Sequence, residues 1–508
     1  MKLRTAVILS CLAGFVSISM EIIWFSIVGY LIQGHAGIFG LVLSILLFGI
    51  AIGSRYINKR IKNINEQEAL QLITKALLLG GIINFAGLPL MAWLITYHIA
   101  FGALILLNIL AISALLGCIF PLLCHVTVST NQQKIGEQTS WIYAANIIGA
   151  TAGPLLTGYV LIDKYPMSSI ISLFCIIPVL LAIFININLI KEKINRNFIL
   201  AGCGIVVFVL LAHNLFYGRF LEMVHFRKEY SAAKKFEHIV ENRSGIITVE
   251  KTDKGDVFYG GGAYDGAINT NPLNHSNRIE RAYMVAALHP SPKKVLMIGL
   301  STGSWAQVLA DFEKIDELVI VEINDGYLEL IAKYPEVAGI LNNKKVKIII
   351  DDGRRWLKMH QQEKFDLIVM NTSFHWREHI TNLLSQDFLL LCKKNLQPNG
   401  VMYWNSTSSP VVLNTACHTF NYVTKYYNFV AGSDAPFSMT EAEKRTAFLA
   451  FKKNGQSILS GSDSANIQLS HFATVPLQNL KDSILQKRLR VITDNNMASE
   501  YKDRFYKR

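Results

Sequence analysis

Hydrophobic residues are distributed unevenly along the chain. Nearly every stretch between residues 5 and 217 is apolar, whereas charges, turns and short mixed segments dominate from residue 219 onward. A helix needs roughly 20 apolar residues to cross a hydrocarbon core, and about seven runs are this long. They are 5–32, 36–57, 74–97, 99–128, 141–162, 166–190 and 198–217. The first lacks a small-residue cleavage site and others follow at once, so a signal peptide does not explain it. The pattern predicts a polytopic helical membrane domain at 1–217.

The second part of the chain alternates strands with helices. Residues 238–266 contain short β-branched or apolar runs separated by Gly, Asp and Lys turns, which predicts a small antiparallel β lobe. Four apolar strands follow, in KKVLMIGL, ELVIVEIND, KVKIIIDDG and FDLIVMNT. Strands separated by helical stretches indicate a parallel, Rossmann-like α/β sheet with ligands at the carboxyl ends of its strands. The expected domains are 218–290 (linker and small β lobe), 291–455 (Rossmann-like, nucleoside-binding) and 456–508 (a tail packing on the soluble domain).

Composition agrees with a membrane protein that carries a soluble domain. Of 508 residues, 51% are hydrophobic and 17% are charged, which is rich in apolar residues for a soluble protein. The net charge of +12 comes partly from Lys and Arg that flank the apolar runs, and no tract of basic and aromatic residues resembles a nucleic-acid module. Five of the seven cysteines lie in the apolar half, and Cys392 and Cys417 lack metal-ligand spacing. We therefore expect a lipid bilayer as partner, no nucleic acid and no metal.

The flanking charges bear on orientation. In an arrangement of seven spans, the basic residues between the runs lie on the same side of the membrane as the amino terminus. Loops rich in Lys and Arg are usually cytoplasmic, so this side should be the cytoplasm. Seven crossings would then place the soluble domain outside the cell, whereas an interfacial 198–217 segment would keep it inside. The number of crossings stays open here. The expected location is the inner membrane, multi-pass, with the soluble domain in the cytoplasm.

Two features of the apolar half stand out. Glu21 lies near the middle of the first run, where a carboxylate costs about 2.5 to 3.5 kcal/mol on insertion scales and should face the bundle interior. It is either a substrate or proton site or a hydrogen-bonded residue that fixes helix packing. Gly149, Gly153 and Gly158 form a small-residue face that favours close helix contact over ligand binding.

The strand ends of the soluble half carry the first chemical inference. Gly299 and Gly303 allow a tight turn after the first strand and bring backbone N–H groups close to a ligand. Glu322 ends the next strand, where it could accept hydrogen bonds from ribose hydroxyls, and Asp352 ends the third, where it could meet an exocyclic amine. Together these positions predict a nucleoside pocket. Its expected cofactor-binding residues are Gly299, Ser301, Gly303, Glu322, Asp352 and Gly353.

Residues 236–405 resemble the polyamine aminopropyltransferases, the spermidine synthases, which share the fold of S-adenosylmethionine-dependent methyltransferases. MEIIWF, LFGIAIGSR, GCIFPLL and YAANIIGATAGPLLTG are similar to the amino-terminal domain of bacterial membrane-fused spermidine synthase-like proteins, and VITDNNMASEY resembles their closing segment. The resemblance implies S-adenosylmethionine or its decarboxylated form as a bound substrate.

Some family positions are kept and others differ. Glu322 matches the family's ribose-binding Glu, and Asp352-Gly353 matches its adenine-contacting pair. In the small lobe, Asp265-Gly266 matches the family's Asp-Gly, whereas Asn269 replaces a Gln. The turn at 299–303 keeps two glycines of a GGGDGG motif and lacks its acid, and Asn324 replaces an Asp. The resemblance assigns Tyr264, Asp265 and Asn269 to substrate binding.

The end of the fourth strand differs most. The family has an Asp there that helps to deprotonate the attacking amine, followed by two small residues and Asp-Pro. This chain has Asn371, then Thr-Ser, then Phe374 and His375. An amide cannot take up a proton near neutral pH, whereas an imidazole can serve as a general base. Asn371 and His375 are the candidate catalytic positions, and a hydrogen-bonded loop histidine is the alternative for His375.

Two functions from different classes follow. The first is a membrane-anchored transferase that moves an aminopropyl or methyl group from S-adenosylmethionine, or its decarboxylated form, to a small-molecule acceptor. The second is a non-catalytic membrane protein whose cofactor-like domain senses a nucleoside or organises the helices. The substitutions at Asn371 and Phe374 argue against ordinary spermidine synthesis. A homodimer is compatible with either function, and the acceptor cannot be read from the sequence.

Overall fold

The computed structural model describes residues 1–128, 132–190, 196–371 and 374–496. The chain divides into two compact units. The first comprises Met1–Ile32, Gly37–Phe236 and Glu241–Gly245, and the second comprises Gln33–Ala36, Glu237–Val240 and Ile246–Arg508. The predicted domain boundaries at 217, 290 and 455 stay predictions.

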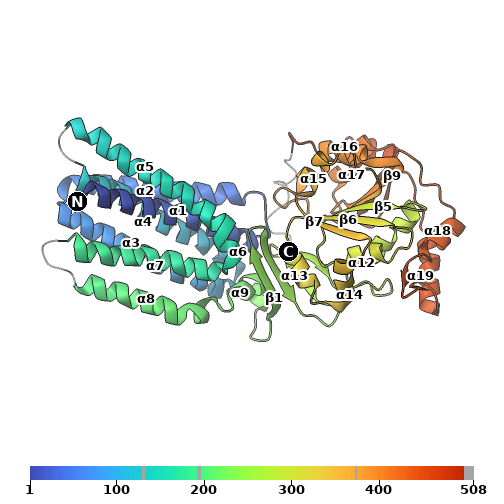
Figure 1. Cartoon of the computed structure of the whole chain (residues 1–508), viewed down its shortest axis with the longest axis horizontal. Helices are drawn as coiled ribbons and strands as arrows, with labels where there is room; N and C mark the ends of the chain where they lie inside the picture. The colour runs from blue at the N-terminus through green and yellow to red at the C-terminus, as the bar shows by residue number, and fades with distance from the viewer. Residues whose placement is uncertain (129–131, 191–195, 372–373, 497–508) are drawn as a thin grey trace. The chain divides into compact units, whose positions relative to one another are not determined.

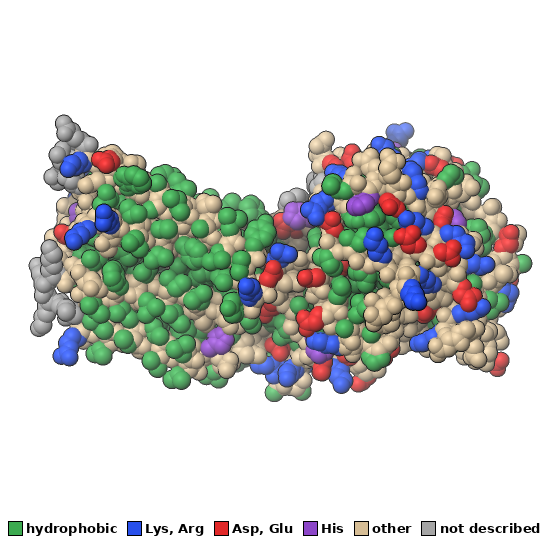
Figure 2. All heavy atoms as spheres, in the orientation of Figure 1, with side chains coloured by type: hydrophobic (Ala, Val, Ile, Leu, Met, Phe, Trp, Pro, Cys, Tyr) green, Lys and Arg blue, Asp and Glu red, His purple; other side chains and the backbone are tan. Residues whose placement is uncertain are grey.

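Long helices build the first unit (Figure 1). Within the described ranges, seven helices are long and apolar enough to cross a membrane, which is compatible with a membrane-spanning region. Figure 2 shows hydrophobic side chains over most of the visible face of this unit. The long helices are α1 (Leu3–Leu31), α2 (Ile38–Arg60), α3 (Glu66–Ile95), α4 (Leu104–Thr127), α5 (Gln132–Leu156), α7 (Met167–Asn188) and α8 (Arg196–Tyr217). The short helical segments are η1 (Ile61–Asn63), η2 (Ile99–Ala103), η3 (Thr157–Leu161), α6 (Ile162–Lys164), α9 (Phe220–Phe226) and η4 (Arg227–Glu229).

Helix α3 begins well before the apolar run that predicted it. The run was expected from residue 74, but the helix starts at Glu66. Asn65 Oδ1 accepts a 2.9 Å hydrogen bond from Glu68 N, and Glu68 Oε2 accepts one of 2.9 Å from Asn65 N. This capping box satisfies backbone groups that would otherwise lack partners, so the polar segment forms the first turns of the helix.

The small-residue face is confirmed at two of its three glycines. A Cβ on Gly149 would lie 1.8 Å from Cys11 O, and one on Gly153 would lie 2.4 Å from Phe15 O, so α1 and α5 touch backbone to backbone. The prediction is wrong for Gly158, because a Cβ there would meet nothing within 4 Å. Glu21 has a half-buried side chain in α1, and both of its readings stay open.

A four-stranded sheet, most of which belongs to the second unit, forms the small lobe. Its strands lie in the order β1 (Phe236–Asn242), β2 (Gly245–Glu250), β3 (Val257–Gly260) and β4 (Ala263–Ala267). Strand β3 pairs antiparallel with both β2 and β4. The predicted antiparallel lobe is therefore confirmed.

The main sheet has seven strands in the order β10-β11-β9-β8-β5-β6-β7. The four predicted strands are β5 (Lys294–Ile298), β6 (Glu317–Glu322), β7 (Val346–Ile350) and β8 (Phe365–Met370). They are parallel to one another and to β9 (Leu396–Asn405). The predicted parallel arrangement of the four strands is confirmed, and one edge of the sheet adds an antiparallel hairpin of β10 (Tyr422–Tyr426) and β11 (Phe429–Ser433) against β9. A tight turn can join antiparallel strands without a crossover helix.

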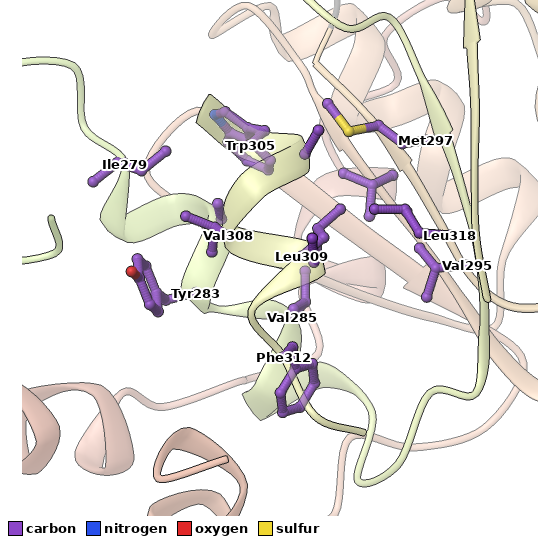
Figure 3. Packing of buried hydrophobic residues seen from close by; sticks show 14 of the residues in the cluster. Ile279, Tyr283, Val285, Val295, Met297, Trp305, Val308, Leu309, Phe312 and Leu318 are labelled. Carbon is purple, nitrogen blue, oxygen red and sulfur yellow. The ribbon is translucent and has the colours of Figure 1, made fainter. Parts of the chain in front are cut away.

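Helices cover both faces of this sheet (Figure 1). Alternate residues of β5 point to opposite faces: Val295 and Met297 join one core, and Leu296 and Ile298 join the other. Figure 3 shows the first core, in which Trp305, Val308 and Leu309 pack beside the strand residues. Because both faces of β5, β6 and β8 are largely buried, these strands are continuous apolar runs in the sequence.

The helices divide between the two cores. Those of the first core are α10 (Glu280–Tyr283), α11 (Val285–Leu288), α12 (Ser304–Ala310), α13 (Gly326–Ile331), α14 (Pro335–Ala338), η5 (Gly339–Asn342), α18 (Glu441–Phe448) and α19 (Asp463–Thr474). Those of the second are α15 (Gly353–Met359), η6 (Ile380–Leu383), α16 (Gln386–Lys394), α17 (Pro410–Thr419) and α20 (Lys481–Leu485). A two-stranded ribbon, β12 (Lys452–Lys453) with β13 (Gln456–Ser457), completes the described elements.

The carboxyl-terminal segment contacts the second core. Ile492 is 1% exposed, and its carbonyl accepts a 2.8 Å hydrogen bond from Gln386 N. Asp494 pairs with the guanidinium of Arg354 and accepts a 2.8 Å hydrogen bond from Ser385 Oγ. Met497 and the rest of the MASEY segment lie outside the described residues.

Candidate active site

The turn between β5 and α12 is held in a shape that needs glycine. Gly299 and Gly303 have φ of 86° and 77°, a region that side chains with a Cβ rarely adopt. Ser301 adopts φ 51° between them. Gly299 N donates a 2.9 Å hydrogen bond to Val321 O, which ties the turn to β6. The predicted tight glycine turn after the first strand is confirmed.

Hydrogen bonds join this turn to the small lobe. Ser301 Oγ donates to Asp265 O at 3.1 Å, and Ser304 Oγ donates to Ala267 O at 3.1 Å. A Cβ on Gly266 would lie 3.1 Å from the Thr302 methyl, so the two segments are in close contact. Residues about 36 positions apart in the sequence thus form one wall.

A cavity of about 190 Å³ opens beside this wall. Its lining comes from the carboxyl ends of β5, β8 and β9, from β4, and from the β10–β11 turn. Strand β5 lies between β6 and β8, so the chain runs in opposite directions across the sheet from this point, which is where open α/β sheets bind ligands. Five of the predicted site residues line the cavity, namely Gly299, Ser301, Asn371, Tyr264 and Asp265.

The other predicted residues do not line it. Asn269 is 7% exposed, and its Nδ2 donates to Asn274 O at 2.7 Å and to Asn277 Oδ1 at 3.0 Å. Its amide therefore fixes the loop after β4. Gly303 lies at the base of the turn, where a Cβ would meet Ile331 at 3.1 Å.

Glu322 is buried behind the glycine turn. Its Oε2 accepts a 2.6 Å hydrogen bond from Leu300 N, and its Oε1 accepts one of 2.8 Å from Asn324 N. Burial raises the pKa of Glu322, while the backbone hydrogen bonds oppose this shift. The carboxylate therefore holds the turn in place, in addition to the ribose role expected of it.

The Asp352-Gly353 pair has a structural explanation that the sequence did not reveal. Asp352 caps α15, its Oδ1 accepting a 2.6 Å hydrogen bond from Arg355 N. A Cβ on Gly353 would lie 2.6 Å from Ile298 Cγ2, so only glycine lets α15 approach β5 this closely. The adenine contact expected of the pair stays a prediction.

The loop after β8 carries Asn371, Phe374 and His375, and its residues 372 and 373 lie outside the described residues. Asn371 and Phe374 line the cavity. His375 does not, and its Nδ1 lies 2.6 Å from Thr407 Oγ1. Thr407 is therefore the partner that a hydrogen-bonded loop histidine would need at this position. The catalytic reading stays untested.

Asp265 is the only carboxylate among the described residues that line the cavity. Its Oδ2 accepts a 2.5 Å hydrogen bond from Tyr327 Oη. The guanidinium of Arg377, whose Nη2 donates to Gly260 O at 3.0 Å, is attracted electrostatically to Asp265. Burial lowers the pKa of Arg377, and the charge of Asp265 opposes that shift. The carboxylate is therefore supported by a hydroxyl and a cation.

Arg281, Asn405 and Asn428 line the cavity and were not predicted. Arg281 Nη1 donates to Asn428 Oδ1 at 2.8 Å, and Asn428 Nδ2 donates to Asn405 Oδ1 at 2.6 Å. These residues come from α10, from the β10–β11 turn and from the end of β9. Only the position of Asn405, at the end of a strand, offered a signal in the sequence. Elsewhere among the described residues, no group of three His, Cys, Asp or Glu could hold a metal ion.

Comparison with known proteins assigns the large domain. Residues 281–440 match the model of the family described as spermine/spermidine synthase domain. The chain carries a spermidine synthase-like aminopropyltransferase domain.

The polyamine aminopropyltransferase of Oceanobacillus iheyensis is 22% identical over 419 residues, covering 80% of this chain and 78% of that protein. Only 508 − 218 = 290 residues follow residue 218, so this match extends into the helical part. A membrane-fused spermidine synthase-like protein is consistent with it.

Other relatives match over shorter stretches. The polyamine aminopropyltransferase of Agathobacter rectalis is 29% identical over 123 residues, 24% of this chain and 42% of that protein. The spermidine synthase of Schizosaccharomyces pombe is 32% identical over 111 residues, 22% of this chain and 37% of that protein. The chain thus spans less than half the length of these two relatives.

Two solved structures are similar at 17% identity, each covering 50% of this chain and 89% of the other. They are a spermidine synthase in complex with the transition-state analogue AdoDATO, with a TM-score of 0.37, and the spermidine synthase of Thermotoga maritima, with a TM-score of 0.36. Scores this low carry no argument about the activity of the domain.

Proposed function

We propose that the protein is a membrane-anchored transferase that binds S-adenosylmethionine, or its decarboxylated form, and transfers a methyl or aminopropyl group to a small-molecule acceptor. The observation that supports this most is the cavity beside the Gly299–Gly303 turn, at the switch point of a domain that matches an aminopropyltransferase family. We further propose that the protein is a multi-pass protein of the inner membrane, with its soluble unit in the cytoplasm where such donors are made.

The donor would lie over the glycine turn. Backbone N–H groups of the turn are close to the cavity, and the Glu322 carboxylate has acceptor capacity left after its backbone hydrogen bonds from Leu300, Asn324 and Ser301. Ribose hydroxyls could use this capacity. Asp352 is exposed at the end of β7, where one of its oxygens could also accept from an adenine amine.

The acceptor would lie in the cavity, near Asn371 and Asp265. The donor supplies a carbon bonded to a positively charged sulfur. An acceptor atom with a lone pair bonds to that carbon, the carbon–sulfur bond breaks, and its electron pair neutralises the sulfur. A proton must leave an amine acceptor. Asn371 cannot take it, whereas the carboxylate of Asp265 can receive it.

A non-catalytic nucleoside sensor is the second candidate. The amide at Asn371 and the ring of Phe374, in the positions where the family has acids, favour it. Such a protein would bind the donor without consuming it.

The leaving product distinguishes these functions even when the acceptor is unknown. The purified full-length protein in detergent is incubated with each donor and a small-molecule extract of cells. Aminopropyl transfer releases methylthioadenosine, and methyl transfer releases S-adenosylhomocysteine. We expect one of the two products to accumulate with time and with enzyme concentration. Donor binding with neither product would support the sensor and contradict the transferase.

A further inference from the structure

The cavity has an unusual charge for an aminopropyl acceptor site. A polyamine is a chain of ammonium groups and needs carboxylates around it. The described lining contains one carboxylate, Asp265, which is already bonded to Tyr327 Oη at 2.5 Å and attracts Arg377. The remaining charged group in the lining is the cation Arg281. The described lining therefore offers no second carboxylate for another ammonium group.

Three hydrogen bonds fix the Arg281 guanidinium in place and leave two of its N–H donors available. Its Nε donates to Arg278 O at 2.8 Å, its Nη2 to Asn277 O at 2.9 Å and its Nη1 to Asn428 Oδ1 at 2.8 Å. The guanidinium carbon lies 5.2 Å from the centroid of the Phe429 ring. A guanidinium has five N–H donors, so two remain for another acceptor. A rigid, stacked guanidinium loses little freedom when it binds an anion.

Arg281 forms no ion pair within the described part of the chain. The charge of the neighbouring residue Glu280 attracts the Arg281 guanidinium. The carboxylate of Glu280 is itself close to two other groups, since its oxygens lie 3.7 Å from Arg278 Nη1 and 3.5 Å from His275 Nδ1.

Asn277, Asn428 and Tyr264, which also line the cavity, are uncharged neighbours of Arg281. These amides are neutral, so they do not cancel the positive charge, and the Asn428 amide has one N–H donor left beyond its bond to Asn405 Oδ1.

From this arrangement, we propose that the acceptor carries an oxyanion, a carboxylate or a phosphate, which Arg281 binds while the reacting amine lies near Asp265 and Asn371. This inference rests on the proposed function, and it names the acceptor as an amine with an anionic group in place of a polyamine. The cavity volume of about 190 Å³ suits a small molecule of this kind.

Four matched probes test the inference by calorimetry on the full-length protein in detergent, with and without methylthioadenosine. Putrescine, 4-aminobutanol and 4-aminobutyrate share a four-carbon amine and end in an ammonium, a hydroxyl or a carboxylate. Phosphoethanolamine separates phosphate from carboxylate. We expect the better of the two anionic probes to bind about tenfold tighter than putrescine, which corresponds to about 1.4 kcal/mol, because its charged group accepts hydrogen bonds from Arg281.

Variants locate the effect. Arg281→Gln should abolish the preference for the anionic probe, and Arg281→Lys should keep part of it. Arg445→Gln is the matched control, because Arg445 is a half-buried arginine of α18 that donates to Ser470 Oγ and lies outside the cavity lining. Its affinities should equal those of the wild type. If Arg281→Gln does not fold, the relative affinities of the four probes for the wild-type protein still test the inference.

Several outcomes would overturn the inference. They are putrescine binding as tightly as both anionic probes, no binding of either anionic probe up to about 10 mM, or equal losses in Arg445→Gln and Arg281→Gln. The proposed function fails separately: an anionic preference without any donor binding would remove the transferase and leave the anion site.

Discussion

Tyr327 donates a 2.5 Å hydrogen bond from its hydroxyl to Oδ2 of Asp265, and so joins helix α13 to strand β4 of the small sheet. The two residues are 62 positions apart in the sequence. Burial, followed by the charges of Asp265 and Glu322, raises the pKa of Tyr327 well above its usual range. The hydroxyl is therefore a neutral donor throughout the working pH range, and it holds the cavity's carboxylate in one orientation.

Tyr327→Phe should lower the stability of the soluble unit by about 1.5 to 3 kcal/mol, because it removes a hydrogen bond to a carboxylate. It should also slow product formation, because Asp265 loses its fixed position. Thermal unfolding and a product assay measure the two effects. Tyr334→Phe is the matched control, since Tyr334 Oη donates to Asp256 at 2.9 Å away from the cavity lining. Equal losses of activity in both variants would contradict a special role for Asp265.

Glu322→Ala should weaken donor binding by about 1.5 to 3 kcal/mol, through loss of the ribose acceptor and of the hydrogen bonds that hold the turn. Glu322→Gln keeps one acceptor oxygen and should lose less. Calorimetry with methylthioadenosine compares the two variants with the wild type. If all three proteins bind it with the same affinity, the nucleoside does not contact this carboxylate.

Restoring the family's acid with Asn371→Asp should not create a spermidine synthase. The new carboxylate would face Phe374 and a cavity with Arg281 in its lining, so a polyamine would still lack its set of acids. We expect product formation from putrescine and decarboxylated S-adenosylmethionine to stay at background in both forms. General-base assistance is worth roughly a hundredfold. A gain of that size in Asn371→Asp would show that the cavity is a polyamine site.

The closing segment should make a pH-dependent contribution to stability through Asp494. Hydrogen bonding from Arg354 lowers the pKa of Asp494, and partial burial opposes this shift. A lowered carboxyl pKa stabilises the fold above the unfolded value of about 3.9, and this stabilisation is lost as the pH falls through the folded value.

Asp494→Asn should therefore lower the melting temperature by a similar amount at pH 7 and pH 5, and the difference should shrink only as the pH falls below about 4. The pair is partly exposed, so the effect should be about 1 kcal/mol or less. Asp253→Asn, in the exposed turn between β2 and β3, is the control. A difference between Asp494→Asn and the wild type that already disappears between pH 7 and pH 5, or that persists unchanged to about pH 2, would contradict this account.

Much of the framework could be predicted from hydrophobic patterning. Strands β5, β6 and β8 are largely buried and the edge strand β7 is rich in isoleucine, so each stands out as an apolar run, and the glycines of the turn follow the first of them directly. The start of α3 was missed, because its first turns are polar and depend on the capping pair of Asn65 and Glu68.

The site was harder to predict, since one residue type can serve two purposes. Asp352 ends a strand, which suggested adenine, yet the same position caps a helix. Arg281 and Asn428 meet across 147 residues, and neither lies in a pattern that marks a site. Strand ends can be ordered from sequence, but the cavity that they form depends on loops whose conformation hydrophobicity does not determine.

The most direct test of the central claim, a nucleoside donor site beside the glycine turn, is calorimetry of the purified full-length protein with S-adenosylmethionine, decarboxylated S-adenosylmethionine and methylthioadenosine. We predict that at least one binds with a dissociation constant in the micromolar range, on the order of −8 kcal/mol, and that Glu322→Ala weakens this binding. A folded protein that binds none of the three at about 1 mM would contradict the claim.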